Sequence, residues 1–388
     1  MNSRERFLAV TNFEPGVRTL KWEMGYWVGA VRRWYKEGLP RVHGVDDKWA
    51  DGDSASGPAN AWWAERARDL DVLKVAGLED GIERIPVYNI FAPKFEDTVI
   101  ETHEDWYIHQ DEYGILRKEA TGRMSLPRYL GWPVTTRDDW EKLKAERLHP
   151  TLEGRLPANW DECMKRYQTR SYPLSIAGFP GGFFGTPRNI LGEENLLFSF
   201  FDDPELIRAI INDLCDFWIG LYDKVLDQTT ADLALIWEDM SFKNGPLISP
   251  KLVREFMLPA YKKLTSFFRD RGIKNILLDT DGDCWSLIPI FMEGGVTGVY
   301  PFEVNANMNV VEVRKAFPTL QMMGGMDKVQ LAHGKEAIDR ELEAKIPFML
   351  KQGGYIPHVD HHVPPDVSWD DFMYYRTKLN DMIDASGK

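Results

Sequence analysis

The residues most suited to chemistry lie together near the end of the chain, in the stretch HVDHH at positions 358–362. Three of the eight histidines and one aspartate stand within this stretch, shortly before Pro364 and Pro365. The preceding GGYI has a glycine pair and a short apolar step, which predicts a strand that ends in a rigid loop. Chemistry in parallel α/β proteins is carried at such strand ends. The alternative is a surface loop whose histidines bind backbone carbonyls.

A second set of candidate residues is acidic. Glu238 and Asp239 follow the apolar run LALIW. Asp279 and Asp281 lie in DTDG after the run NILL, and Glu303 follows GVYPF. Carboxylates and imidazoles gathered at one edge of a sheet are suited to moving protons or to binding a hard metal ion. The alternative is that these acids cap helix N-termini, where the helix dipole favours negative charge.

A repeating pattern of strands and helices is needed to position these groups. In the second half of the chain, five successive units each combine a buried apolar strand, a polar or glycine-rich loop and a helical pattern. One unit has a strand at 233–237 and a helix that begins after the predicted N-cap Ser249, with Pro250 at its first position. KWEM, VYNIF and SYPLSIAG supply three earlier strands. Eight such units predict an α/β fold of the (β/α)8 (TIM) barrel type, with one functional mouth.

The chain is predicted to form one domain, residues 1–388, with an N-terminal extension. A long insertion, roughly residues 97–170, separates the second and third predicted strands. Its charged, tryptophan-rich sequence is typical of a lid or an oligomer contact. An open doubly wound sheet is the alternative fold, but no G-x-G-x-x-G or phosphate-loop pattern follows the first strand.

Composition narrows the class of protein. The formal net charge of −13 gives no general basic field, so nucleic acid and anionic membranes are poor partners. The three cysteines stand far apart, which argues against a disulfide scaffold, a zinc ribbon or an iron–sulfur site. No signal-like leader or membrane-length apolar run occurs in the sequence. We therefore expect a cytoplasmic protein.

Long stretches of the chain resemble the uroporphyrinogen decarboxylase superfamily. The resemblance rests on EDMSFKNGPLISP, DTDGDCWSLIPIFMEGGVTGVYPFEV, MMGGMDK and HVDHHVPPDV, together with SRERFLAVTNFEPGVR and AGFPGGFFGTPRNILG. It implies the (β/α)8 fold and, by family likeness, a homodimer. The superfamily contains decarboxylases and corrinoid-dependent methyltransferases, so the resemblance leaves the activity open.

The decarboxylase motifs of that superfamily are largely missing. Where the family has R-Q-A-G-R, this chain has EMGYW, so Glu23 and Tyr26 lie where arginines should hold the substrate carboxylates. The aspartate expected after the second strand is replaced by Asn89. The closing histidine is retained and is best matched by His361. A substrate with many carboxylates needs cationic partners, so uroporphyrinogen is not expected as a substrate.

The methyltransferase branch implies a different set of residues. In family members that methylate thiols, a motif resembling H-x-C-G and a later cysteine bind zinc. This chain has DTDG and HVDHH at those places. The remaining oxygen and imidazole donors imply a harder zinc centre. Its predicted ligands are Glu238, Asp281, Asp360 and His361.

The resemblance and these donors favour a corrinoid-dependent methyltransferase that demethylates an aryl methyl ether, because the departing oxygen needs a proton or a metal. The residues predicted to take part in catalysis are Asp281, His361, Tyr300 and Glu303. Those predicted to form apolar walls for a small aromatic substrate are Tyr26, Trp27, Phe183, Phe184 and Phe302. The chain lacks the cobalamin motif D-x-H-x-x-G, so the cobalamin is expected on a separate corrinoid protein.

Two other functions stay open from the sequence. One is a decarboxylase-type lyase that acts on a smaller acid, with His361 and Asp281 handling protons. The other is a non-catalytic protein that binds a small aromatic or tetrapyrrole ligand. In each case HVDHH should close the eighth strand, which would bring His361 within reach of Asp281 and leave His358 the most tolerant of the three histidines to substitution.

Overall fold

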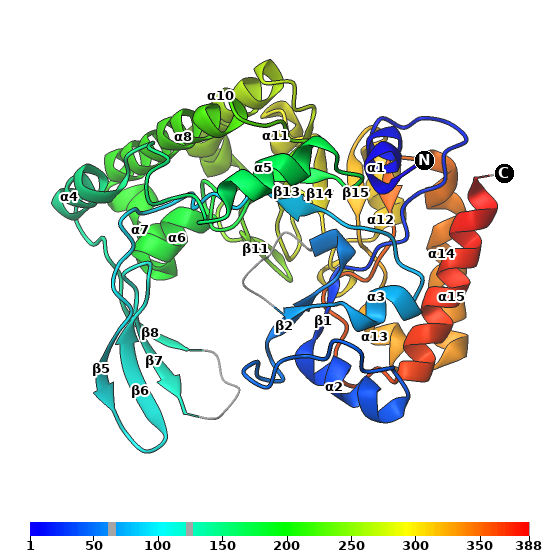
Figure 1. The fold of residues 1–388 in the computed structure, drawn as a ribbon. Coiled ribbons are helices and arrows are strands. Elements are labelled where there is room, and N and C mark those ends of the chain that lie inside the picture. Colours follow the sequence, from blue (N-terminus) through cyan, green and yellow to red (C-terminus); the bar gives the residue numbers. More distant parts are fainter. Residues whose placement is uncertain (61–66, 122–126, 388) are drawn as a thin grey trace.

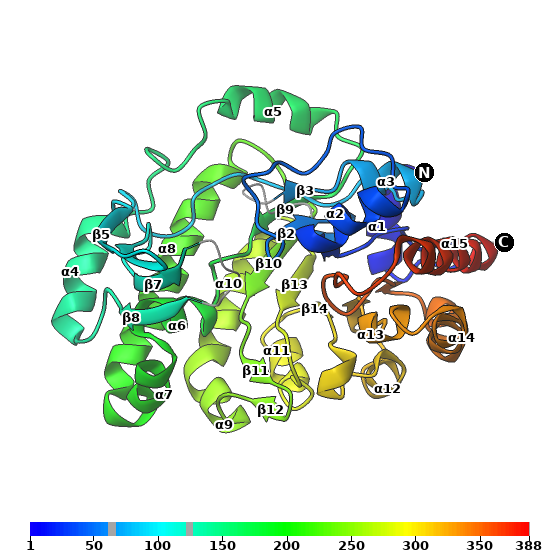
Figure 2. The ribbon, with the colours of Figure 1, turned by 90° about the horizontal axis from the view of Figure 1, so that it is seen from below.

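The computed structural model describes residues 1–60, 67–121 and 127–387. Its centre is a curled sheet of seven parallel strands (Figure 1). In sheet order these are β16 (Tyr355–Ile356), β15 (Gln321–Met323), β14 (Gly298–Tyr300), β13 (Asn275–Asp279), β10 (Leu233–Trp237), β9 (Leu174–Ala177) and β4 (Glu83–Arg84). Helices lie around the strands, as seen from below in Figure 2. This is the predicted α/β fold of TIM-barrel type, in a single domain.

The gap between β16 and β4 is occupied by the N-terminal segment. Tyr26, in β1 (Gly25–Trp27), forms a parallel bridge with Val363 beyond β16. On its other side β1 pairs antiparallel with β2 (Ser54–Ser56), and β2 pairs with β3 (Ala67–Arg68). The N-terminal segment therefore takes the place of the remaining barrel strand next to the loop that contains HVDHH.

The helices around the barrel follow the predicted strand–loop–helix order. They are α1 (Ser3–Thr11), α2 (Val28–Glu37), α3 (Asp71–Val75), α4 (Arg137–Arg147), α5 (Trp160–Gln168), α6 (Gly185–Leu191), α7 (Glu193–Asp202), α8 (Pro204–Leu226), α9 (Pro250–Leu252), α10 (Leu258–Asp270), α11 (Ile288–Glu293), α12 (Val310–Ala316), α13 (Lys328–Leu331), α14 (Lys335–Gln352) and α15 (Trp369–Ser386). At α9 the Ser249 side chain accepts from the amide of Leu252, and Pro250 is the first helical residue, which confirms this predicted helix start. No helix of the described residues is long and apolar enough to span a bilayer.

Two of the predicted strands lie at other residues than the apolar pattern indicated. The strand expected in KWEM is displaced to β1, and the carbonyl groups of Glu23 and Met24 instead accept single hydrogen bonds from the amides of Ala59 and Gly57, each at 3.0 Å. The strand expected in VYNIF is displaced to β4. Pro86 follows closely on β4 and has no amide hydrogen to continue the ladder.

The core has two parts, which follow from the alternation of side chains along each strand. Leu233, Leu235 and Leu277 face the barrel interior, where they pack with Phe7 and Val10 of α1. Residues of the opposite parity pack beneath the outer helices. The next interior positions toward the carboxyl ends of β10 and β13 belong to polar or amphipathic side chains. The apolar interior therefore gives way to a polar mouth.

The predicted insertion contains a separate four-stranded antiparallel sheet. Its strands are β5 (Thr98–Thr102), β6 (Trp106–Gln110), β7 (Leu116–Ala120) and β8 (Arg128–Gly131), in that order. We call this sheet the arm, because it extends away from the barrel in Figure 1. Residues 122–126 of the insertion lie outside the described part of the chain. The role of the insertion as a lid or contact stays a prediction.

Candidate active site

Asp281 and His361 face each other at the carboxyl ends of the strands. Nε2 of His361 lies 3.8 Å from Oδ2 of Asp281. Asp281 follows β13 and His361 follows β16, so the sheet brings together residues that are distant in the sequence. The side chain of Asp281 is 36% exposed and that of His361 is 24% exposed, so both are open to a ligand. The expected approach of these two residues is present, and we call them the Asp281–His361 pair.

Asp279 is a second acid beside this pair. It lies two residues before Asp281, and the charge of Asp279 acts on the Asp281 carboxyl group. Tyr300 is opposite Asp279 in the parallel ladder, and their side chains are hydrogen-bonded. Burial and the negative charge of Asp239 raise the pKa of Asp279 to about 8, although the Tyr300 hydrogen bond opposes this rise.

Asp281 is also a weak acid in this setting. Although its side chain is partly exposed, desolvation within the barrel mouth is the main cause that raises the pKa of Asp281 well above the usual range, and the charges of Asp279, Asp239 and Glu303 add to it. Lys328 acts in the opposite direction. Asp279 therefore retains its proton near neutral pH, and the raised pKa of Asp281 favours its protonated form, so both acids are suited to donate a proton.

Glu303 and Asp360 hold the loops on which the central pair lies. The Gly282 amide donates to Glu303 at 3.0 Å, and the Val304 amide donates to Asp360 at 3.0 Å. The ammonium group of Lys328 lies 3.2 Å from Asp360 and 3.7 Å from Glu303. Glu303, predicted as catalytic, thus has both carboxylate oxygens engaged with the protein. Its contacts fit a role in positioning the loop of Asp281.

The three histidines of HVDHH have different surroundings. His361 is the partly exposed one, while His362 and His358 are almost fully buried. His362 packs against Trp27, with ring centroids 5.1 Å apart, and is hydrogen-bonded to Ser54. The Nδ1 atom of His358 lies 2.7 Å from the next carbonyl oxygen, and burial lowers its pKa to about 4. His358 is therefore neutral and does not share the position of His361.

Of the five predicted wall residues, one lies beside the central pair. The ring centroid of Trp27 is 6.1 Å from that of His361. The other four are almost fully buried in the outer core, namely Tyr26, Phe183, Phe184 and Phe302. The structure does not support them as substrate walls. They were chosen for aromatic character near strand ends, but strand alternation turns Tyr26 toward Trp34 and Phe372 beneath the helices.

Two aromatic residues that the sequence prediction missed lie at the mouth instead. Trp237 continues the interior parity of Leu233 and Leu235 on β10, and Phe179 packs edge-on against it at 4.8 Å. The guanidinium of Arg188 lies 5.4 Å from the Trp237 ring centre. The alternation within LALIW was the signal that identifies Trp237. Phe179 had no comparable signal, because it lies in a loop.

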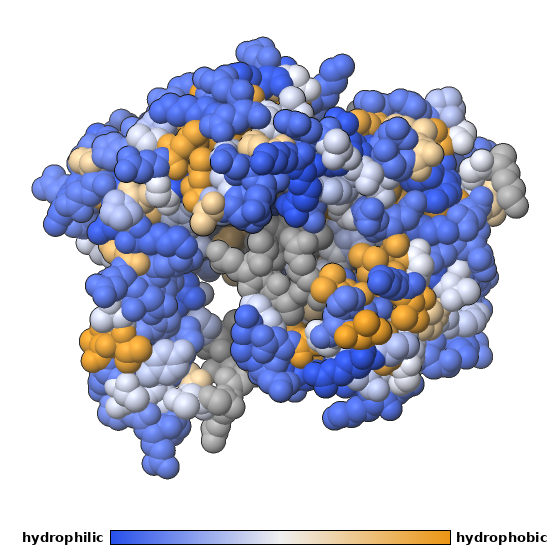
Figure 3. Space-filling view, viewed as in Figure 1, coloured by the Kyte–Doolittle hydropathy of each residue, from blue (hydrophilic) through white to orange (hydrophobic). Residues whose placement is uncertain are grey.

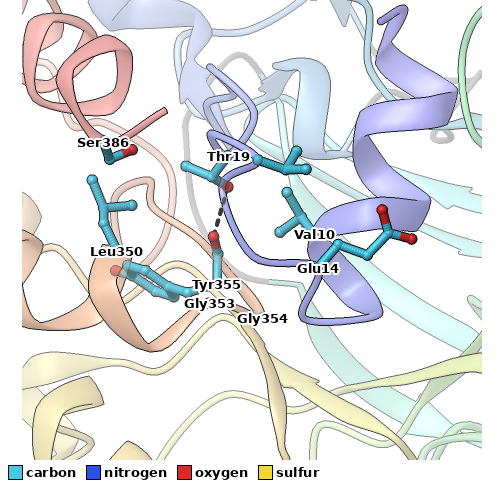
Figure 4. A pocket seen from close by; sticks show the side chains of 9 residues that line it. Val10, Glu14, Thr19, Leu350, Gly353, Gly354, Tyr355 and Ser386 are labelled. Carbon is cyan, nitrogen blue, oxygen red and sulfur yellow. Dashed lines mark hydrogen bonds between the residues drawn. The ribbon is translucent and has the colours of Figure 1, made fainter. Parts of the chain in front are cut away.

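A small cavity lies at the opposite end of the barrel from the Asp281–His361 pair. It has a volume of about 20 Å³, enough for a water molecule. Figure 4 shows its lining, which comes from α1 and the following loop, the end of α14, the start of β16 and the end of α15. The cavity contains none of the predicted site residues and is not a candidate active site.

Comparison with known proteins is consistent with the fold. Residues 122–377, more than half of the chain, match the family described as uroporphyrinogen decarboxylase (URO-D). The chain belongs to the URO-D family. Its fold is similar to that of a methyltransferase from Methanosarcina mazei, with a TM-score of 0.57, 13% sequence identity, and coverage of 98% of this chain and 99% of that chain. No curated protein gives a significant sequence match.

Glu23 and Tyr26, which stand where the decarboxylases were expected to have their cationic clamp, are fully buried in this URO-D chain. Glu23 accepts a hydrogen bond from the Val359 amide at 2.9 Å and pairs with Arg376 at 3.3 Å. Glu23, Arg376 and Tyr26 are all buried. Glu23 therefore braces HVDHH from behind through Val359, and neither Glu23 nor Tyr26 is exposed at the mouth.

The four predicted zinc ligands do not form one site in this URO-D structure. Glu238 is buried and accepts from the amides of Phe183, Phe184 and Gly185 and from the Tyr261 hydroxyl. Asp360 is engaged by the loop contacts described above. Within the described residues, no group of three or more histidine, cysteine or acidic side chains is arranged to hold a metal ion. Structural and catalytic zinc sites use three or four protein ligands, so the residues present do not fit resident zinc.

Proposed function

We propose that this protein is a corrinoid-dependent methyltransferase that removes the methyl group from a small aryl methyl ether. The observation that carries the proposal is the Asp281–His361 pair, an acid and an imidazole 3.8 Å apart at the open end of a URO-D barrel. The fold similarity to a solved methyltransferase supports the reaction class. The corrinoid, bound to a separate protein, supplies the cobalt(I) nucleophile that receives the methyl group.

The residues of this chain would act on the leaving oxygen. As the methyl carbon–oxygen bond breaks, its electron pair remains on the aryl oxygen. Asp281 donates a proton to that oxygen, so that a neutral phenol leaves rather than a phenolate. Its raised pKa favours the protonated form that this step requires. His361 is placed to stabilise the carboxylate that Asp281 then becomes.

Aromatic side chains at the mouth provide the binding surface of the proposal. Trp27 lies beside His361, and Trp237 with Phe179 lies on the β9–β10 side of the barrel. All three are partly exposed. Flat apolar walls with a few polar groups suit a small aromatic ligand. We assign the substrate-wall role to these residues in place of Tyr26, Phe183, Phe184 and Phe302.

Exposed apolar side chains at the rim of the barrel form the proposed docking surface for the corrinoid partner. Phe242, in the hairpin of β11 (Ser241–Phe242) and β12 (Gly245–Pro246), is 59% exposed, and Trp285 is 37% exposed. The Asp283 amide donates to the Phe242 carbonyl at 2.8 Å, which attaches this hairpin to the loop of Asp281. We infer that the partner docks over Phe242 and Trp285. A cytoplasmic location fits the reducing conditions that cobalt(I) requires.

The direct test is methyl transfer in a purified system. The protein is mixed with cob(I)alamin and a panel of methoxyarenes such as 2-methoxyphenol, and formation of methylcobalamin is followed by its visible spectrum. We expect turnover of at least one ether, and a loss of roughly a hundredfold or more in His361→Ala, the usual scale for one acid–base group. His333→Ala, an exposed histidine before α14, is the matched control and should keep the full rate.

Two outcomes would contradict the proposal. If no ether of the panel gives methyl transfer, either with free cobalamin or with a corrinoid protein in its place, the proposed reaction class is excluded. Turnover that is unchanged in both His361→Ala and Asp281→Asn would remove the assigned acid. Release of carbon dioxide from a small aromatic acid, lost in the same variants, would instead establish the decarboxylase-type alternative. Tight binding of such ligands without turnover would establish the binding-protein alternative.

A further inference from the structure

Strand β5 forms an open edge of the arm that nothing in the described chain covers. In the sheet order β5-β6-β7-β8, strand β5 has a partner on one side only. All five of its residues, Thr98–Thr102, are exposed, whereas those of β6 and β7 are half-buried. Figure 1 shows β5 on the side of the arm that faces away from the barrel. The unpaired amide and carbonyl groups of such an edge can accept another strand.

The sequence of this edge favours pairing. Thr98, Val99, Ile100 and Thr102 are all β-branched, and Val99 and Ile100 are 58% and 61% exposed. Figure 3 shows an apolar patch on this part of the otherwise mainly polar surface of the arm. Edge strands of monomeric proteins are usually protected by lysine, proline, inward-pointing charge or a β-bulge. The residues of β5 include neither lysine nor proline.

The single charge on β5 is already partnered. Glu101 lies 2.6 Å from His103, whose ring stacks on Trp106 with centroids 3.7 Å apart. This contact keeps the carboxylate within its own chain. It leaves a short edge that is apolar at its centre and uncharged at both ends.

We propose that β5 pairs antiparallel with β5 of a second copy of this chain, so that two arms form one eight-stranded sheet with four strands from each copy. The sequence TVIET can align antiparallel with itself about Ile100. In the two-fold register Ile100 lies opposite Ile100, Val99 opposite Glu101, and Thr98 opposite Thr102. No like charges are opposed, and apolar and β-branched pairs are the cross-strand pairs that stabilise sheets.

The bulge in β5 is compatible with this register. The pairing of β5 with β6 shifts between Val99 and Glu101, so Ile100 is the extra residue. In the two-fold arrangement the two bulges coincide at the centre, and both strands bend alike. Five residues on each side bury less than the roughly 1,600 Å² of a standard interface, so the dimer should be weak and should form in the micromolar range or above.

The test is sedimentation velocity of the full chain over a concentration series from about 1 to 200 µM. We expect reversible monomer–dimer exchange for the natural protein. Ile100→Lys places two ammonium groups opposite each other and should weaken association at least tenfold, as should Ile100→Glu. An equimolar mixture of the two variants should associate again, because lysine then lies opposite glutamate. Phe201→Lys, at a residue of α7 that is 72% exposed, is the matched surface control and should behave as the natural chain.

Each outcome decides for or against the pairing. A monomer at every concentration overturns it, and so does a dimer that persists in Ile100→Lys. Failure of the mixture to recover association shows that Ile100 is not opposite its own copy, which overturns the register. Thermal unfolding of each variant shows whether the arm remains folded. Because Ile100 is largely exposed, its replacement should leave the midpoint unchanged within a few degrees.

Discussion

Replacing Arg376 tests how the loop that carries His361 is held. The Arg376 side chain is fully buried, and one of its terminal nitrogens lies 3.3 Å from Glu23 and donates to the Trp22 carbonyl. Glu23 in turn accepts the Val359 amide hydrogen. The substitution Arg376→Met keeps most of the side-chain volume and removes the charge. It leaves Glu23 as a buried carboxylate without its cationic partner.

The expected loss is large because the pair is fully buried. Removing one partner of a buried ion pair costs about 3–5 kcal/mol in free energy of unfolding. Glu23→Gln/Arg376→Met should recover more than half of that loss, because glutamine still accepts the Val359 amide hydrogen and leaves no orphan charge. Lys378→Met on the same helix is the control. Lys378 pairs with Asp339 and Glu343 near the surface, so its loss should cost under about 1 kcal/mol.

The loss should also depend on pH. Burial raises the pKa of Glu23, and Arg376 opposes that rise, so the pKa should increase further in Arg376→Met. An acid with a raised folded-state pKa binds its proton more tightly in the folded chain. Its stabilising contribution is present below the unfolded-state pKa and is lost as pH rises through the folded-state pKa. The destabilisation should therefore be greatest at neutral pH and shrink toward pH 4–5, the ordinary range of glutamate.

Urea unfolding followed by tryptophan fluorescence, at pH 7 and pH 5, measures both effects. The reasoning is refuted if Arg376→Met loses less than about 1 kcal/mol at pH 7, or if it loses the same amount at both pH values. A double variant no more stable than Arg376→Met would show that the loss comes from packing or from the Trp22 carbonyl rather than from the orphan carboxylate of Glu23.

Three further predictions concern the mouth. His361→Ala should lower the methyl-transfer rate roughly a hundredfold or more with KM little changed, and His358→Ala should lower it less than tenfold; steady-state kinetics on one ether separates the two. Asp279→Asn should raise the unfolding midpoint at pH 8 and leave it unchanged near pH 4. The pKa of Asp279 is raised to about 8 in the folded chain, so between pH 4 and pH 8 its ionisation favours the unfolded chain. Calorimetry at both pH values checks this. Uroporphyrinogen should give no coproporphyrinogen above a heat-killed control by chromatography, since Glu23 and Tyr26 are buried and supply no cationic clamp.

The barrel could be predicted from the sequence because its signal is local and repeated. Buried runs such as 233–237 end at polar residues and are followed by helices, one of which has a clear start signal at Ser249 and Pro250. Parallel strands then require their ends to meet at one edge. That geometry was sufficient to place Asp281 and His361 together, although many residues separate them in the chain.

The wall residues and metal ligands could not be predicted in the same way, because they depend on which side of a strand or turn a side chain faces. A shift of one residue reverses the face of every side chain in a strand. Phe183 and Phe184 follow a Gly-Gly turn and pack into the outer core, and the amides of both donate to Glu238. These hydrogen bonds satisfy the Glu238 carboxylate, so it needs no other partner. A sequence records the carboxylate but not the amides that satisfy it.

The position of His361 follows from contacts that are remote from any reacting atom. Behind the loop, Glu23 and Arg376 hold the amide of Val359, and in front, Lys328 holds Asp360. These anchors attach to the two residues that precede His361, and the ring of His361 is also hydrogen-bonded to that of His362 at 3.2 Å. The His361 ring is left partly exposed and available to Asp281 and to a ligand. The acidic residue found where the decarboxylase arginines were expected thus has a structural use: Glu23 supports the mouth from inside the core instead of binding a substrate within it.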